Sequence, residues 1–286
     1  LWKSDGTALG TTLVKGVDGR PERLTAVGPT LYFYAKHEPN GRELWVSNGT
    51  KAGTRMVKDI AGGQGSGAPE FLTTAAGYLW FSAATPAYGR EPWRSNGKKA
   101  GTKRVGDIRP GSEDSNPSGF TGFKGKAYFG ARGPVALGYE PWKSDGTKAG
   151  TRLVRDVRSG TGSSSPDGWV TMGGHGYFAT LRAAGGDGLH RTDGTWKGTR
   201  VVRAIDTGDE GYDSHWMARV GKSVFFAAAT PDRELWRTRG TGAWRVMDIN
   251  PGSAESQPTW LTRLGDRLYF VADDGKHGGE LWMWKP

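Results

Sequence analysis

Glutamate, aspartate and tryptophan recur at fixed positions along this chain, where they could act as acid–base groups or as sugar-binding platforms. Paired carboxyl groups can transfer protons, and the flat face of an indole ring can stack on a sugar. A role that recurs in every copy of a repeat is usually structural. We therefore expect the tryptophans to pack between repeats, and the carboxylates to accept backbone hydrogen bonds or to pair with arginine. The tryptophans are Trp45, Trp93, Trp142, Trp236 and Trp282; the glutamates are Glu43, Glu91, Glu140, Glu234 and Glu280; the aspartates are Asp59, Asp107, Asp156 and Asp248.

Side chains that differ from repeat to repeat are better candidates for a binding site. At the start of one predicted strand in each repeat, a single position holds Arg23, Phe71, Trp169, Trp216 and Trp260 in turn. Aromatic rings stack on the apolar faces of sugars, and basic neighbours bind carboxylates or sulfates. The alternative is that these rings pack between repeats. Long loops rich in glycine, serine, aspartate and proline precede most of these positions, at residues 61–69, 109–118, 158–167, 206–214 and 250–258.

Three histidines join the candidate ligand-binding residues. His37 and His277 lie in predicted loops, and His215 opens a strand. A histidine-based metal site needs a convergence of side chains that this spacing does not indicate, so we predict no metal site. The acidic loops at residues 206–213 and 273–275 carry the ligand type that Ca²⁺ needs, but neither has the spacing of an EF-hand. We therefore assign no Ca²⁺ site and predict no cofactor.

A repeat organises these residues. Tryptophan, or histidine in one case, recurs at positions 2, 45, 93, 142, 190, 236 and 282, about 46 residues apart, which is a period typical of propeller blades. Each repeat contains four short runs of β-branched and aromatic residues, and Asn-Gly or Asp-Gly turns follow most of the tryptophans. The pattern predicts an all-β, six-bladed β-propeller with four antiparallel strands per blade, forming a single domain over residues 1–286.

The two ends of the sequence predict how the ring closes. The chain begins with a fourth strand at residues 12–14 and ends with a third strand around Leu281 and Trp282. We predict that residues 1–20 complete the C-terminal blade. Trp2 and Trp282 share one repeat position, so only one of them can occupy the third strand of that blade. Because the sequence begins in the middle of a repeat, we expect it to be a trimmed part of a larger exported protein.

Composition narrows the class of function. The chain has no cysteine, which excludes disulfides, thiolate metal sites and cysteine nucleophiles. No stretch approaches the 18 or so apolar residues of a membrane span. The formal charge of +10 predicts affinity for polyanions, although the basic residues are dispersed along the chain. The sequence contains no His-Glu-x-x-His, Gly-x-Ser-x-Gly or P-loop motif.

The repeated motifs resemble the ELWxxDGT repeat family of bacterial proteins, which is common in myxobacteria and their relatives. The resemblance rests on Glu-Leu-Trp at 43–45, 234–236 and 280–282, on Asp-Gly-Thr at 5–7, 145–147 and 193–195, and on Val-x-Asp-Ile at 57–60 and 105–108. It covers almost the whole chain and implies an exported protein, extracellular or at the cell surface. One repeat departs from the motif, with Gly188, His190 and Ala204 where glutamate, tryptophan and aspartate are expected.

These observations favour a non-catalytic, lectin-like module that binds a glycan, in particular an acidic polysaccharide, through the face formed by the loops between fourth and first strands and between second and third strands. Nucleic acid would bind only non-specifically. The alternatives are a polysaccharide lyase or hydrolase with one asymmetric site on the same face, and a protein-binding or structural scaffold. The candidate ligand-binding residues are Arg23, His37, Phe71, Trp169, His215, Trp216, Trp260 and His277.

Overall fold

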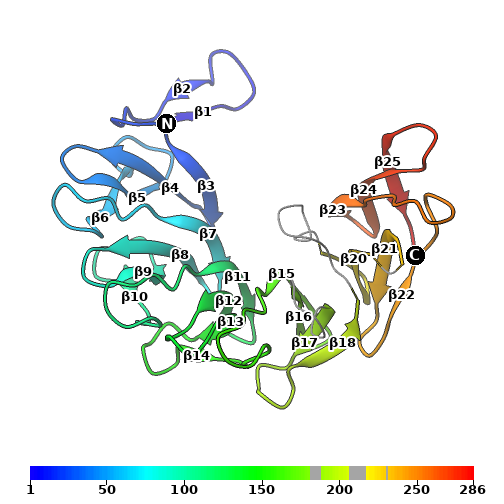
Figure 1. Ribbon diagram of the computed structural model, residues 1–286. Helices are drawn as coiled ribbons and strands as arrows, with labels where there is room; N and C mark the ends of the chain where they lie inside the picture. Colours follow the sequence, from blue (N-terminus) through cyan, green and yellow to red (C-terminus); the bar gives the residue numbers. More distant parts are fainter. Residues whose placement is uncertain (181–187, 206–216, 230) are drawn as a thin grey trace. The chain divides into compact units, whose positions relative to one another are not determined.

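The computed structural model describes residues 1–180, 188–205, 217–229 and 231–286, and every regular element among them is a β-strand (Figure 1). The strands form seven sheets, five of four strands, one of three and one of two, and neighbours in each sheet follow chain order. The chain therefore has the all-β, propeller-like repeat architecture of antiparallel sheets that the sequence predicts. No helix among the described residues is long and apolar enough to cross a membrane.

The chain divides into two compact units, which are described separately. The first is Leu1–Val135 with Lys143–Arg152, and the second is Ala136–Trp142 with Leu153–Pro286. The single domain over residues 1–286 stays a prediction. The first unit contains a two-stranded sheet, β1 (Trp2–Lys3) and β2 (Thr12–Leu13); a sheet of β3 (Glu22–Val27), β4 (Thr30–His37), β5 (Gly41–Ser47) and β6 (Arg55–Lys58); and a sheet of β7 (Glu70–Ala75), β8 (Tyr78–Thr85), β9 (Gly89–Ser95) and β10 (Lys103–Arg104).

The later sheets repeat this order. The third four-stranded sheet begins with β11 (Ser118–Phe123) and β12 (Lys126–Arg132), which belong to the first unit, and continues with β13 (Tyr139–Ser144) and β14 (Arg152–Leu153). The second unit contains a sheet of β15 (Asp167–Met172), β16 (His175–Thr180), β17 (Gly188–Thr192) and β18 (Arg200–Ala204); a sheet of β19 (Ala218–Val220), β20 (Ser223–Ala229), β21 (Arg233–Thr238) and β22 (Ala243–Arg245); and a three-stranded sheet of β23 (Thr259–Leu264), β24 (Arg267–Asp273) and β25 (Gly279–Trp284).

Apolar side chains fill the space between neighbouring sheets. In the first unit, Leu44 and Val46 of β5 form one buried cluster with Leu79 and Phe81 of β8. The third-strand tryptophans contribute to such packing, as the sequence predicts. Those at positions 45, 93, 142 and 236 are all buried.

One repeat uses a histidine in the place of this tryptophan. His190 is buried and stacks on Phe178 with the ring centroids 5.4 Å apart. The Trp93 ring stacks on Phe81 in the same way at 6.4 Å. Burial lowers the pKa of His190 to about 4, so the imidazole is neutral at pH 7 and packs as an aromatic ring.

The recurring glutamate fixes the loop that leads into the next sheet. The Glu43 carboxylate is fully buried and accepts backbone N–H bonds from Ile60, Ala61 and Gly67, at 3.0, 3.3 and 2.9 Å. Because β7 begins at Glu70, these bonds set where that strand starts. Glu91, Glu140 and Glu234 hold their loops in the same manner, each also accepting a serine hydroxyl bond. This confirms the structural role predicted for these four residues.

The fourth-strand aspartates also act within loops. Asp59 accepts N–H bonds from Gly62 and Gly63, and Asp156 accepts one from Gly160. Asp107 pairs with Arg104 at 3.2 Å, and Asp248 pairs with Arg245. Each aspartate therefore serves a turn or pairs with arginine, as the repeat pattern predicts.

The Asp-Gly-Thr turns are stabilised by hydrogen bonds among their own residues. The Asp145 carboxylate accepts bonds from the backbone N–H and the hydroxyl of Thr147, and the Thr147 hydroxyl accepts the N–H of Gly150. A Cβ on Gly150 would lie 2.0 Å from the Asp145 carboxylate, so only glycine fits there. Local hydrogen bonding thus explains the repeated Asp-Gly-Thr-x-x-Gly motif, in which the exposed carboxylate and hydroxyl serve the turn itself.

The sheets nearest the two chain ends lack strands that the others have. Trp282 lies in β25 and donates its indole N–H to the Ala272 carbonyl at 2.9 Å, so Trp282 takes the third-strand place in its sheet. Trp2 lies in β1, paired with Leu13, and its side chain is exposed. Glu280, the counterpart of Glu43, is exposed as well. A six-bladed closed ring stays a prediction.

Candidate ligand-binding site

The first strand of five sheets carries a bulge at its second residue. In β7, for example, the pairing with β8 shifts register between Glu70 and Thr73. The backbone at the bulge takes a left-handed conformation, which favours glycine. Two sheets have glycine there and three do not. The bulge residues are Arg23, Phe71, Gly119, Gly168 and Trp260, with φ of 54°, 54°, 65°, 64° and 56°.

The bulge corrects one alignment made from the sequence. Trp169 was expected at the same position as Phe71, but Gly168 occupies it and Trp169 is the following residue. Trp169 is half-buried and stacks on Phe178 at 4.5 Å, so its ring packs within its own sheet. The sequence alignment was wrong here because the bulge position requires glycine-like geometry, whereas the alignment matched aromatic residues.

A non-glycine residue in this conformation costs about 1–2 kcal/mol. Phe71 and Trp260 nevertheless occupy bulges with 51% and 58% of their surface exposed. Each residue is about half buried, so packing offsets part of that cost. Backbone strain of this kind at an exposed aromatic residue is typical of functional positions.

The hydroxyl two residues after each of these bulges stabilises the bend. Thr73 donates to the Phe71 carbonyl at 3.1 Å, and Thr262 donates to the Trp260 carbonyl at 2.9 Å. Thr25 lies within hydrogen-bond distance of the Arg23 carbonyl at 3.1 Å and of the Leu72 carbonyl of the neighbouring strand at 3.3 Å. A Leu-Thr pair directly after an exposed side chain is therefore the sequence signal for this bulge.

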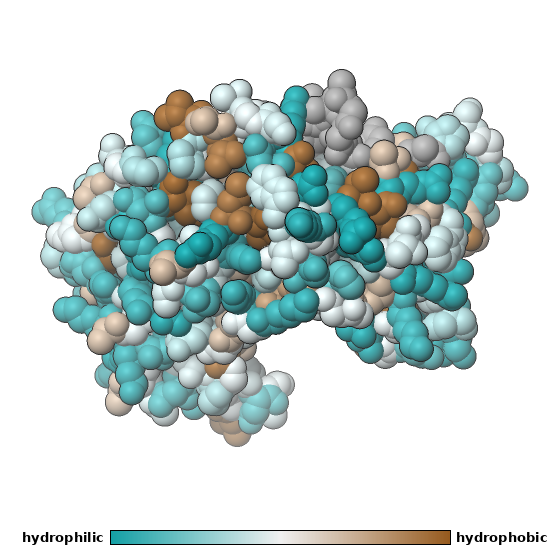
Figure 2. Space-filling view, turned by 90° about the horizontal axis from the view of Figure 1, so that it is seen from below, coloured by the Kyte–Doolittle hydropathy of each residue, from teal (hydrophilic) through white to brown (hydrophobic). Residues whose placement is uncertain are grey.

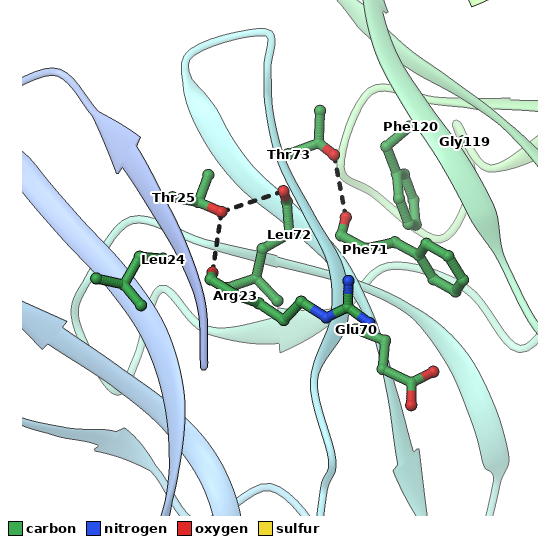
Figure 3. A pocket seen from close by; sticks show the side chains of 9 residues that line it. All are labelled: Arg23, Leu24, Thr25, Glu70, Phe71, Leu72, Thr73, Gly119 and Phe120. Atoms are coloured by element: carbon green, nitrogen blue, oxygen red, sulfur yellow. Dashed lines mark hydrogen bonds between the residues drawn. The ribbon is translucent and has the colours of Figure 1, made fainter. Parts of the chain in front are cut away.

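Three of these bulged strands surround one pocket in the first unit (Figure 3). Its volume is about 530 Å³, within the range of small-molecule sites. Gly119 lines the pocket with its backbone alone, and the buried Phe120 lies beside it. The lining residues are Arg23, Leu24 and Thr25 from β3, Glu70, Phe71, Leu72 and Thr73 from β7, and Gly119 and Phe120 from β11.

The charged side chains around the pocket differ in their partners. Glu70 lies 3.5 Å from Arg90, whose guanidinium also donates to the Ala68 carbonyl and to Ser82. Glu22 accepts a bond from the Tyr34 hydroxyl at 2.7 Å. Among the described residues, no carboxylate lies within ion-pair distance of Arg23, which is exposed and extends toward Phe71 in Figure 3. Arg23 interacts with the Tyr34 hydroxyl, so it gives the pocket a cation that has a neutral polar partner and no carboxylate at ion-pair distance among the described side chains.

The other predicted site residues lie elsewhere. Trp260 is in β23 of the second unit. His37 lies 3.3 Å from Asp18 and packs on Trp45, in the first unit. His277, in the second unit, lies 2.8 Å from Asp274, and the pKa of the imidazole is raised by that carboxylate. His215 and Trp216 lie outside the described residues.

One carboxylate cluster was not anticipated from the sequence. Asp232, Glu234 and Asp248 lie close enough together to share an ion. Arg245 donates to Asp232 at 2.8 and 3.3 Å and to Asp248, so a guanidinium pairs with two of the three carboxylates.

The two acidic loops considered for Ca²⁺ consist of other residues than this cluster. In the loop after β24, Asp274 accepts the backbone N–H groups of Lys276 and His277. The acidic loop at residues 206–213 lies outside the described residues.

Exposed apolar residues are scattered over the surface. On the face shown in Figure 2 they form several separate patches surrounded by hydrophilic residues. Isolated exposed apolar residues are common on protein surfaces and need no explanation. The pocket is therefore a more specific candidate site than these patches.

The chain is similar in fold to several solved structures. No family model matches it and no curated protein matches it. A computationally designed protein, Ika8, has a TM-score of 0.52 and 14% identity over 96% of this chain and 74% of its own. A prolyl endopeptidase has a TM-score of 0.54 and 11% identity over 99% of this chain and 46% of its own.

A Mycobacterium tuberculosis puromycin-hydrolyzing peptidase has a TM-score of 0.51 and 12% identity over 100% of this chain. The chain spans 47% of that peptidase, so it covers about half the length of these enzymes. At such identities the likeness concerns the fold alone, and it agrees with the propeller-like repeat architecture.

Proposed function

We propose that this chain is a non-catalytic, lectin-like module that binds a glycan in the pocket between β3, β7 and β11. The observation that carries the proposal is the exposed Phe71 ring, held at a left-handed backbone position beside a pocket, where the neighbouring strand has Gly119. An aromatic face stacks on the C–H groups of a sugar ring. Selection for such a contact accounts for a residue that the backbone alone would disfavour.

The lining favours binding over catalysis. A glycosidase uses two carboxyl groups across the scissile bond, and Glu70 is the single carboxylate among the described lining residues. That carboxylate pairs with Arg90 at 3.5 Å. The remaining lining residues offer an aromatic face, a cation and apolar surface, which suit recognition. The formal charge of +10 supports an acidic polysaccharide as partner.

A glycan array tests this proposal. The wild-type chain should bind a subset of glycans, and Phe71→Gly, which keeps the bulge geometry, should abolish that binding. Tyr88→Ala is a matched control, because Tyr88 is an exposed aromatic residue of the same unit outside the pocket. No glycan bound by the wild type, or binding that Phe71→Gly leaves unchanged, would contradict the proposal.

We also propose that the chain belongs to an exported protein of the ELWxxDGT type and that its sheets close into six blades. The repeat supports closure through Glu280. In three sheets the glutamate accepts the backbone N–H of the residue 17 positions later, as Glu43 does from Ile60. For Glu280 that position lies beyond Pro286, and the equivalent residue in the N-terminal repeat is Val17. Closure would bring the Val17 N–H to Glu280 and cover Leu281, which is 72% exposed whereas Leu44 is fully buried.

Hydrogen exchange tests the closure. The Val17 amide should be protected from exchange in the monomer. Glu280→Ala should remove that protection and lower the midpoint of denaturant unfolding, as expected when a loop loses its anchoring glutamate. Val17 exchanging as freely in the wild type as in Glu280→Ala would contradict closure. So would protection that appears only as concentration rises, since that indicates pairing between two copies.

A further inference from the structure

The same bulge position supplies a different chemical group from each of three strands around the pocket. Arg23 of β3 supplies a cation, Phe71 of β7 supplies a ring face, and Gly119 of β11 has no side chain. Their backbones have nearly the same φ, so only the side chains differ. A pocket with a charge on one side and an aromatic face on another can orient a ligand that carries both an apolar face and an anion.

The anion would meet Arg23 without a competing carboxylate among the described side chains. Glu70 pairs with Arg90. Glu22 accepts a bond from the Tyr34 hydroxyl, which also interacts with Arg23, so a bound anion would share Arg23 with that hydroxyl. A guanidinium can donate two parallel N–H bonds to one carboxylate, which fixes the orientation of the anion as well as its charge. A ring lying on Phe71 would therefore present its carboxylate toward Arg23.

We propose that the pocket selects a sugar that bears a free carboxylate, a uronate residue of an acidic polysaccharide, through Arg23. This inference rests on the proposed function and adds the chemical class of the ligand and the residue that discriminates it. Phe71 supplies affinity for the sugar ring whatever its charge. Arg23 supplies the preference for the acid over its neutral ester.

Titration calorimetry with two probes of equal length tests the inference. The probes are a short oligogalacturonate and the same oligomer with every carboxylate methyl-esterified, which removes the charge and keeps the rings. The wild type should bind the acid at least tenfold more tightly than the ester. Arg23→Gln should weaken binding of the acid about tenfold and leave binding of the ester unchanged.

Arg20→Gln is the control for net charge, because Arg20 is exposed, lies three residues from Arg23 and does not line the pocket. It should change the affinity for either probe less than twofold. Thermal unfolding confirms that the variants fold.

The first contrary result is a wild type that does not discriminate between the probes: if it binds acid and ester equally, and Phe71→Gly still loses binding, the carboxylate selectivity is overturned and the proposed function is kept. An equal loss in Arg20→Gln and Arg23→Gln would also overturn the selectivity, since it indicates non-specific attraction. Neither probe bound by the wild type would overturn the uronate inference, and the glycan array would then decide the proposed function.

Discussion

The sheet of β7–β10 contains two repeat positions that differ in how much their residue type varies from sheet to sheet. At one end of β9, Glu91 is buried and accepts bonds from the Ile108 and Arg109 N–H groups and the Ser115 hydroxyl. At the bulge of β7, Phe71 is exposed in a conformation that favours glycine. The first position is the same glutamate in several sheets, and the second varies from arginine to glycine. The repeated residues hold the fold, whereas the varied residues are free to form a site.

The largest expected effect lies at a repeated core residue. Trp93→Ala should lower the free energy of unfolding by about 3–5 kcal/mol, because Trp93 is buried between sheets and leaves a cavity. Denaturant unfolding measures the change. A variant as stable as the wild type would show that the repeated tryptophans do not carry the core.

The buried glutamate should come next. Glu91→Gln places an amide N–H₂ group where an oxygen now accepts hydrogen bonds, which should cost about 1–3 kcal/mol in the free energy of unfolding. Glu255→Gln is the control, since Glu255 is exposed. Equal stabilities for the two variants, measured in the same denaturant titration, would break the contrast between repeated and varied positions.

The buried glutamates also predict a pH dependence. Burial raises the pKa of Glu43 and of Glu91 to about 7. A folded pKa above the unfolded value gives stability that is complete below the unfolded pKa, about 4.5, and is lost as pH rises through about 7. His190 acts in the opposite sense, with stability lost as pH falls from about 6.5 toward 4. Between pH 6.5 and 8 the raised pKa of His277 acts in the same sense as the glutamates, so the difference between the wild type and Glu91→Gln isolates the contribution of Glu91.

In that window the free energy of unfolding should fall by about 1 kcal/mol. Denaturant midpoints at the two pH values measure the fall, and Glu91→Gln should show a shallower one. Stability that rises between pH 6.5 and 8 would contradict the assignment of these carboxyl groups.

The smallest effect is expected at a bulge. Trp260→Gly should raise the free energy of unfolding by up to about 1 kcal/mol, because glycine relieves the left-handed backbone and the Trp260 ring is 58% exposed. Thermal and denaturant unfolding measure the change. A loss of 2 kcal/mol or more would show that the Trp260 ring serves packing.

The repeat made much of the fold predictable. The spacing of Trp45, Trp93, Trp142 and Trp236 indicated packing between sheets, and the repeated glutamates indicated loop anchors, because each copy solves the same local problem of burial and hydrogen bonding. The site was predictable only in part. Arg23 and Phe71 were recognised, but a bulge opposes two residues to one, so an alignment of aromatic residues placed Trp169 where Gly168 lies. Gly119 also lines the pocket at a bulge, and a comparison of aromatic and charged side chains does not detect a glycine.

The measurement that tests the account most directly is made on Phe71→Gly, with unfolding and glycan binding followed on the same sample. We expect a variant as stable as the wild type, or more stable by up to about 1 kcal/mol, that binds at least tenfold less tightly to a glycan recognised by the wild type. A variant that loses several kcal/mol of stability, or that binds as the wild type does, would contradict the claim that Phe71 is retained for ligand binding against the preference of its backbone.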